Sequence, residues 1–347
     1  MINIISNISY HGDIIKNRIA YYDQLRVLSI LAIIAIHVFQ LWHHGEQVFN
    51  VYIYMFSEFA RFGVPVFLML SGALLLNRDI EIKSFLKRKV PRIAYPFLFY
   101  FIIFWLSSFL LNREFSYTIF TYNWYFWMIL GVYLSVPIIN KFIQQASESE
   151  IEYFLAIFVL AAIFYQITLI FGIEHYFDLN FFVAPIGYLV LGYYLSIKQF
   201  NIDSKKLIIL MAVIFLTATF FKMLETGAVL PKNSILNYVA TQTAIVGSWV
   251  DMSIFEILQA GSLFVLFKNL NLHIMDKVIV SISNVSYGMY LCNSLVMSFL
   301  IPIFTPIPSN GIEICAIIIV MILVVFVVSW ILVTLISRIP VIGKYCT

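Results

Sequence analysis

The stretch YYDQLRVLSILAIIAIHVFQ, residues 21–40, decides the fold. It is a long run of aliphatic and aromatic residues, and about 20 predominantly apolar residues in a helix are enough to span the hydrocarbon core of a bilayer. Charged and ionisable side chains interrupt the run: Asp23 and Arg26 stand near its beginning, and His37 lies deep inside it. Ionisable groups inside a membrane are rare and costly, and they indicate functional sites. The stretch therefore predicts a membrane span that contains a candidate site.

The composition extends this prediction to the whole chain. Of the 347 residues, 62% are hydrophobic and 11% are charged, whereas a soluble domain has about 25% charged residues. We expect an all-α polytopic membrane protein in which a cytoplasmic segment, 1–24, precedes a single bundle, 25–336, and a cytoplasmic tail, 337–347, follows it. The apolar runs predict ten transmembrane helices, near 25–44, 51–76, 94–112, 124–143, 152–172, 179–199, 206–226, 251–269, 283–305 and 312–336.

The loops differ in their content of Lys and Arg. Those on the side of the N-terminus hold most of these residues, whereas the opposite loops hold essentially Arg113 and Lys232. Cytoplasmic loops carry the excess of positive charge, so both termini are expected in the cytoplasm. The formal net charge of +3 gives no indication of nucleic-acid binding. The three cysteines have no close spacing, so neither a disulfide framework nor a metal site is predicted.

Arg26 and His37 are eleven positions apart. At about 100° per residue they share one face of a helix and lie roughly 16 Å apart along its axis. Taken alone, Arg26 also fits a positive-inside anchor, and His37 also fits a structural hydrogen bond between helices.

Glu58 lies in the second predicted span, at about the depth of His37. A carboxylate at that depth could orient the imidazole and raise its basicity. The alternative is an ion pair with Arg61, three residues further along the same helix.

Four cations stand within six residues in a predicted cytoplasmic loop: Lys87, Arg88, Lys89 and Arg92. A basic cluster beside a membrane is expected to meet anionic lipid headgroups. The alternative is a docking site for a phosphorylated cofactor, because guanidinium groups bind phosphate through two parallel hydrogen bonds.

These stretches resemble the type-three integral membrane acyltransferase family. The resemblance covers most of the chain, and its most specific element is YYDQLR (21–26) followed by ten residues and His37. The matching segments that follow are FGVPVFLMLSGALLL (62–76), FLKRKVPRIAYPF (85–97), WYFWMILGVYLSVPIIN (124–140) and SNVSYGMYLCNSLVM (283–297). The closest subgroup O-acylates bacterial surface glycans, and it includes the enterobacterial common antigen acetylase and a biofilm polysaccharide acyltransferase.

The resemblance implies transfer of an acetyl or similar short acyl group from cytoplasmic acyl-CoA to a hydroxyl of a cell-surface or lipid-linked glycan. The protein would then lie in a bacterial plasma membrane, with the lipid bilayer and possible further copies of itself as partners. His37 would be the general base, Arg26 would line the channel, and the basic cluster would bind the CoA phosphates. The chain departs from many relatives in having Asn293 where they have a second histidine and Lys87 and Lys89 where they have two arginines.

The acceptor would meet aromatic and amide side chains near the outer ends of later spans. Aromatic residues in a membrane protein are more often belt or core residues, but Tyr122, Trp124 and Trp127 could line a glycan groove. Asn293 can donate and accept hydrogen bonds, so we expect it to contact the substrate as well. Two other functions stay open: an exporter of polysaccharide or another solute, which buried polar groups such as Glu58 would also suit, and a membrane scaffold without turnover.

Overall fold

The computed structural model describes residues 18–41, 56–112, 124–170, 180–225, 253–270, 272, 276–304, 311–340 and 343. Within these residues there are ten α-helices and no strand, and each helix corresponds to one predicted span. The helices are α2 (Ala20–Leu41), α4 (Gly63–Leu75), α5 (Ile82–Asn112), α7 (Trp124–Gln145), α8 (Glu148–Ile170), α9 (Asn180–Ile197), α10 (Ser204–Glu225), α12 (Ile254–Asn269), α13 (Asp276–Leu300) and α14 (Gly311–Ser337), with a 3-10 turn at Ile301–Ile303.

The predicted fold class, an all-α polytopic membrane protein, is confirmed. Eight helical segments are long and apolar enough to cross a membrane by length and composition. The two others are shorter: α12 has 16 residues, and the apolar part of α9 is Pro185–Ile197. Both carry fully buried residues, including Leu189 on α9 and Phe264 on α12.

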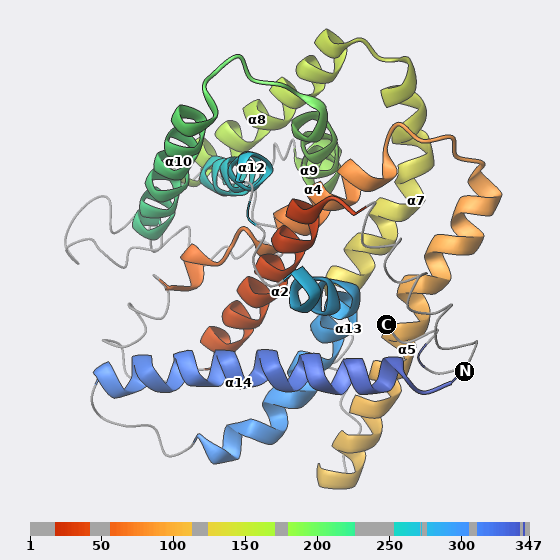
Figure 1. The fold of residues 1–347 in the computed structure, drawn as a ribbon, viewed down its shortest axis with the longest axis vertical. Coiled ribbons are helices and arrows are strands. Elements are labelled where there is room, and N and C mark those ends of the chain that lie inside the picture. The colour runs from red at the N-terminus through yellow and green to blue at the C-terminus, as the bar shows by residue number, and fades with distance from the viewer. Residues whose placement is uncertain are drawn as a thin grey trace.

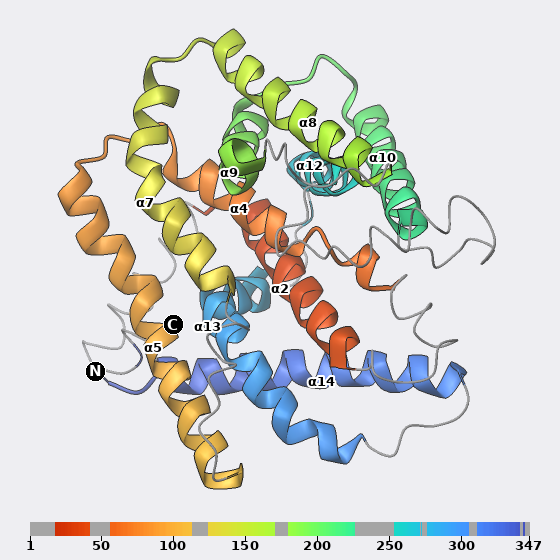
Figure 2. The same ribbon diagram turned by 180° about the vertical axis from the view of Figure 1, so that it is seen from behind.

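Helix α2 lies at the centre and joins two groups of helices (Figure 1). On one side it packs against α4 and α12, which belong with α8, α9 and α10. On the other side it packs against α13 and α14, and α13 in turn contacts α5. Figure 2, from behind, shows α8 passing in front of α12, which it contacts. The helix that carries Arg26 and His37 is therefore the hub of the bundle.

Two glycines bring α4 and α9 into backbone contact. A Cβ on Gly72 would lie 1.7 Å from the Leu189 carbonyl oxygen, and a Cβ on Gly192 would lie 2.0 Å from the Met69 carbonyl oxygen. Small residues at a crossing allow membrane helices to approach closely and to gain van der Waals contact. This contact fixes α4, and through it one side of α2.

Span two is interrupted instead of continuous. Residues 56–59 form one helical turn, 60–62 form a turn, and α4 begins at Gly63. Pro65 explains the break, because it has no N–H to bond the carbonyl of Arg61 and its ring clashes with that carbonyl. Glu58 and Arg61 therefore lie at a break in the helix, outside α4.

The basic stretch predicted as a loop is helical. Helix α5 begins at Ile82 and continues through Pro91 and Pro96, so Lys87, Arg88, Lys89 and Arg92 lie on its first turns. Prolines are tolerated inside membrane helices, where neighbouring groups satisfy the freed backbone carbonyls. The span was expected to begin near 94 because the charged residues before that position are not part of the apolar run from which the span was predicted.

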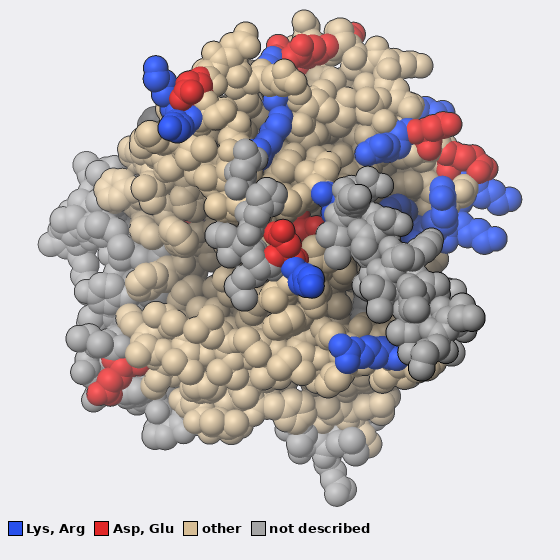
Figure 3. Space-filling view, viewed as in Figure 1, with Lys and Arg blue, Asp and Glu red and all other residues tan. Residues whose placement is uncertain are grey.

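Charge is unevenly spread over the face drawn in Figure 3. Most Lys and Arg side chains lie over the upper and right parts, where α5 begins, and the broad lower part is nearly free of charge among the described residues. Helices at the periphery expose large apolar side chains, as expected of surface that faces lipid. On α14 these include Ile319, Val320, Leu323, Val327, Ile331 and Leu335.

Candidate active site

Arg26 and His37 both face α13. The Arg26 guanidinium donates from Nη1 to Ser283 Oγ at 3.2 Å, and Nδ1 of His37 lies 2.7 Å from Asn293 Oδ1. The step of eleven positions from Arg26 to His37 on α2 therefore lies beside the step of ten positions from Ser283 to Asn293 on α13. The two steps correspond to helical rises of roughly 16 and 15 Å. The two helices run parallel, and the shared face predicted for Arg26 and His37 points into the seam between them.

At the Arg26 end of this seam, Ser283 links Arg26 to a buried carboxylate. Asp23 is 4% exposed and receives two hydrogen bonds from Arg18, at 2.9 and 2.6 Å. It also accepts a hydrogen bond from Ser283 Oγ at 2.5 Å. Asp23 thus pairs directly with Arg18, and it reaches Arg26 through Ser283.

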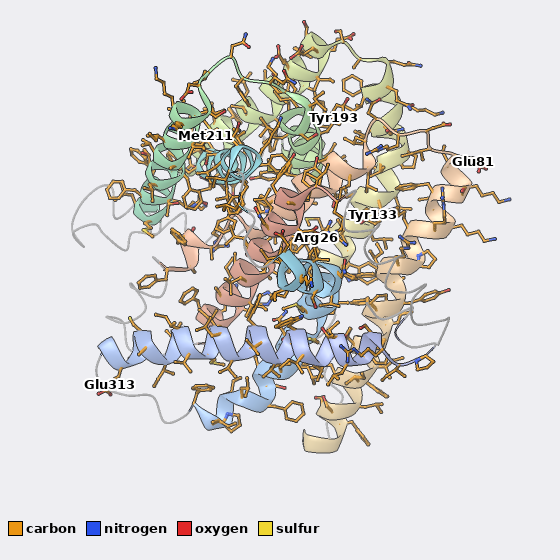
Figure 4. All side chains as sticks on the ribbon, in the orientation of Figure 1. Arg26, Glu81, Tyr133, Tyr193, Met211 and Glu313 are labelled. Carbon is orange, nitrogen blue, oxygen red and sulfur yellow. The ribbon has the colours of Figure 1, made fainter. Side chains whose placement is uncertain are left out.

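The Arg26 guanidinium keeps donors for a ligand. Ser283 is its one hydrogen-bond partner among the residues that the structure describes, and a guanidinium has five N–H donors. Tyr133 of α7 is close enough to interact electrostatically with both Arg26 and Arg92. Figure 4 places Arg26 and Tyr133 in the middle of the molecule, with Glu81 and Glu313 at opposite edges. Positive charge therefore continues from the start of α5 towards the seam.

Of the four basic residues on α5, Lys89 is the one that is partly buried. Lys89 stands four positions after Phe85 and four before Ile93, which are 4% and 6% exposed, so it shares the inward face of α5. Arg92 interacts with Lys89 and with Tyr133. Lys87, Arg88 and Arg92 are exposed, and Arg88 bonds back to the carbonyl of Ser84.

Tyrosines surround the half of the seam that contains His37, and the sequence analysis did not single out Tyr287 or Tyr290 among them. The Tyr290 ring centre lies 6.2 Å from that of His37 and 4.9 Å from that of Tyr125. Tyr287 stacks on Tyr290 at 6.3 Å and donates its hydroxyl proton to the carbonyl of Ile93 on α5. The spacing of Ser283, Tyr287, Tyr290 and Asn293 would have identified one helix face.

Glu58 does not contact His37, among the residues that the structure describes. Its Oε1 accepts from Arg61 Nε at 3.2 Å, the alternative left open by the sequence, and Lys222 Nζ lies 4.0 Å from its Oε2. The depth predicted for Glu58 does not say on which side of α2 it lies. Phe56, two residues before Glu58, stacks on Phe39 at 6.3 Å. Phe39 is about 200° around α2 from His37. Glu58 therefore lies behind α2, away from the seam.

The residues expected to contact the acceptor have different surroundings where the structure describes them. Tyr122 lies outside the described residues. Trp124 is partly buried against Tyr125, and Trp127 is 51% exposed beside Phe97 and Phe126. Asn293 is fully buried against His37. A glycan groove at Tyr122, Trp124 and Trp127 stays a prediction.

No group of three or more His, Cys, Asp or Glu side chains is placed to hold a metal ion within the described ranges. In the same ranges, Cys292 and Cys315 are free thiols.

Comparison with known proteins identifies the family of the chain. A model of the type-three acyltransferase domain matches residues 19–334, which is nearly the whole chain. Neither the curated proteins nor the solved structures contain a significant match. The matched range includes α2, the basic start of α5 and α13. The chain therefore belongs to the type-three acyltransferase family, and it is a multi-pass membrane acyltransferase that transfers groups other than aminoacyl groups.

Proposed function

We propose that the protein moves an acetyl or similar short acyl group from cytoplasmic acyl-CoA to a hydroxyl of a cell-surface or lipid-linked glycan in a bacterial plasma membrane. The observation that carries the proposal is the seam between α2 and α13, with Arg26 at one end, which we place on the inner side of the membrane, and the His37 imidazole towards the outer end. The subgroup that O-acetylates enterobacterial common antigen and biofilm polysaccharides remains the expected relative, on the motifs alone.

The inner end suits the donor. Lys89, Arg92 and Arg26 would bind the phosphate groups of acyl-CoA, since guanidinium groups form charge-assisted, bidentate bonds to phosphate. Lys87 and Arg88 would add a less specific attraction. The pantetheine arm would then extend along the seam towards His37, a rise of roughly 16 Å from Arg26.

The outer half suits the transfer step. His37 takes the proton of the acceptor hydroxyl while that oxygen forms a bond to the thioester carbonyl carbon. The carbon–sulfur bond then breaks, and His37 returns the proton to the departing thiolate, which leaves as CoA. General-base assistance contributes roughly 10²–10⁴-fold, and holding both substrates in one seam contributes through effective molarity.

The exporter alternative has one observation in its favour. Glu58, Lys222 and Gln259 form a second buried polar cluster behind α2, and buried ionisable groups also line transport paths. Membership of the acyltransferase family favours transfer. The Glu58–Arg61 pair at the break in span two gives this cluster a structural role as well.

The test is binding and transfer of radiolabelled acetyl-CoA, then succinyl-CoA, by the protein in nanodiscs supplied with a membrane glycan extract. His37→Gln should bind acetyl-CoA as wild type does and lose transfer by roughly 10²–10⁴-fold. Arg26→Ala should weaken binding. Arg78→Ala is the matched control, because Arg78 is an exposed cation whose backbone, not its side chain, bonds Asn140. If the protein bound none of the acyl-CoAs, this result would contradict the proposed transfer and favour the exporter function.

A further inference from the structure

We propose that Asn293 holds His37 in the tautomer with its proton on Nδ1, so that Nε2 is the nitrogen that takes the proton from the acceptor. The catalytic part of this inference rests on the proposed function. The tautomer itself rests only on the contacts of the two side chains, and it can be measured without any substrate.

The first step is the orientation of the Asn293 amide. Its Nδ2 donates to the backbone carbonyl of Met289 at 3.3 Å and to that of Tyr290. A carbonyl oxygen only accepts hydrogen bonds, so the NH₂ group must face these two oxygens. Turning the amide round would place Oδ1 against two other acceptors and would lose both bonds.

The second step is the protonation of the imidazole. With the amide held in this way, Oδ1 faces His37 Nδ1 at 2.7 Å. Oδ1 accepts, so Nδ1 must donate, and a neutral imidazole has a single N–H. Nε2 therefore carries the lone pair. It has no hydrogen-bond partner among the described residues, which leaves it available to a hydroxyl group.

The third step is the charge of the partner. A carboxylate beside Nδ1 would favour the imidazolium form, which has no lone pair to offer. The amide of Asn293 is uncharged and 0% exposed, so it orients the ring without trapping a proton on Nε2. Asn293 acts through His37 and is therefore a positioning residue.

The test is the tautomer of His37 in lipid bilayers without substrate. Protein labelled isotopically in the histidine rings is studied by solid-state NMR, where nitrogen–carbon correlations separate Nδ1 from Nε2 and the nitrogen shift reports the attached proton. His37→Gln assigns the His37 signals by their loss. Wild type should show a protonated Nδ1 and an unprotonated Nε2. A protonated Nε2 in neutral wild-type protein would overturn the inference.

Two variants separate the tautomer from general damage. Asn293→Leu is similar in size and removes the acceptor, so it should populate the other tautomer and lower kcat by roughly 10–100-fold, the effect of removing a partner that orients a functional histidine. Cys292→Ala is the matched control: Cys292 is the adjacent residue, equally buried, and bonds the same Met289 carbonyl. It should keep the wild-type spectrum and kcat.

The outcomes also separate this inference from the proposed function. The expected spectrum together with full transfer by His37→Gln would leave the tautomer standing and remove His37 as the base. Transfer that requires His37 together with a wild-type tautomer unchanged in Asn293→Leu would remove Asn293 as the positioning residue and keep the base.

Discussion

At the scale of single residues, the structure gives Arg26 a support that the sequence could not show. Ser283 Oγ donates a hydrogen bond to the carboxylate of Asp23, and it accepts a hydrogen bond from the Arg26 guanidinium. The serine is thus both donor and acceptor, which fixes the direction from which Arg26 is held. The depth of Glu58 was deduced from its position in the chain. The side of α2 on which it lies depends on how the helices pack, which no local sequence pattern predicts.

This support leads to a prediction for Ser283→Ala. Loss of a hydrogen bond to a charged group costs about 1.5–3 kcal/mol, so the Kd for acetyl-CoA should rise about 13- to 160-fold. Binding titrations in nanodiscs measure it. The control is Ser286→Ala, which removes a buried hydroxyl one turn further along α13; among the described residues this hydroxyl bonds only the Ser283 carbonyl. Equal affinities for Ser283→Ala and wild type would contradict the role given to Ser283.

At the scale of elements, the positions of the helices were predictable and their partners were not. The predicted spans 124–143 and 312–336 agree closely with α7 and α14, because apolar runs of sufficient length determine where a helix crosses a membrane. The beginning of α5 was wrong by about three turns, since charged residues can extend a helix beyond the apolar run. Packing partners depend on surface shape, as the contact between α4 and α9 shows.

That contact predicts a strong effect of a single methyl group. Gly72→Ala would place Cβ on the backbone of α9, and overpacking of this kind costs about 1–3 kcal/mol or more. The melting temperature of the purified protein should fall. Gly131→Ala is the control, because a Cβ at Gly131 meets nothing within 4 Å, and it should leave the melting temperature unchanged or slightly raised. A Gly72→Ala protein as stable as Gly131→Ala would show that α4 and α9 do not pack in this way.

At the scale of the whole molecule, we expect the start of α5 to face the cytoplasm and the start of α14 to face the opposite side. Glu81 and Glu313 mark these two edges (Figure 4). The excess of Lys and Arg on the α5 side is the reason, because cytoplasmic loops retain positive charge.

Cysteine labelling in intact cells tests this orientation. In a variant without the native cysteines, Glu148→Cys should react with a membrane-impermeant maleimide only after permeabilisation, and Glu313→Cys should react before it. Both positions are exposed. Labelling of Glu148→Cys in intact cells would reverse the orientation and place the basic end of α5 outside.

The parallel register of α2 and α13 has a consequence for insertions and deletions. One residue inserted between Arg26 and His37 would rotate the imidazole by about 100° and shift it by about 1.5 Å, away from Asn293. Four inserted residues would restore the face to within about 40° but would displace the ring by about 6 Å, beyond the reach of the amide. The spacing of Arg26 and His37 on α2 thus has to match the spacing of Ser283 and Asn293 on α13. Substitutions of the side chains between Arg26 and His37 should therefore be tolerated far better than insertions or deletions there.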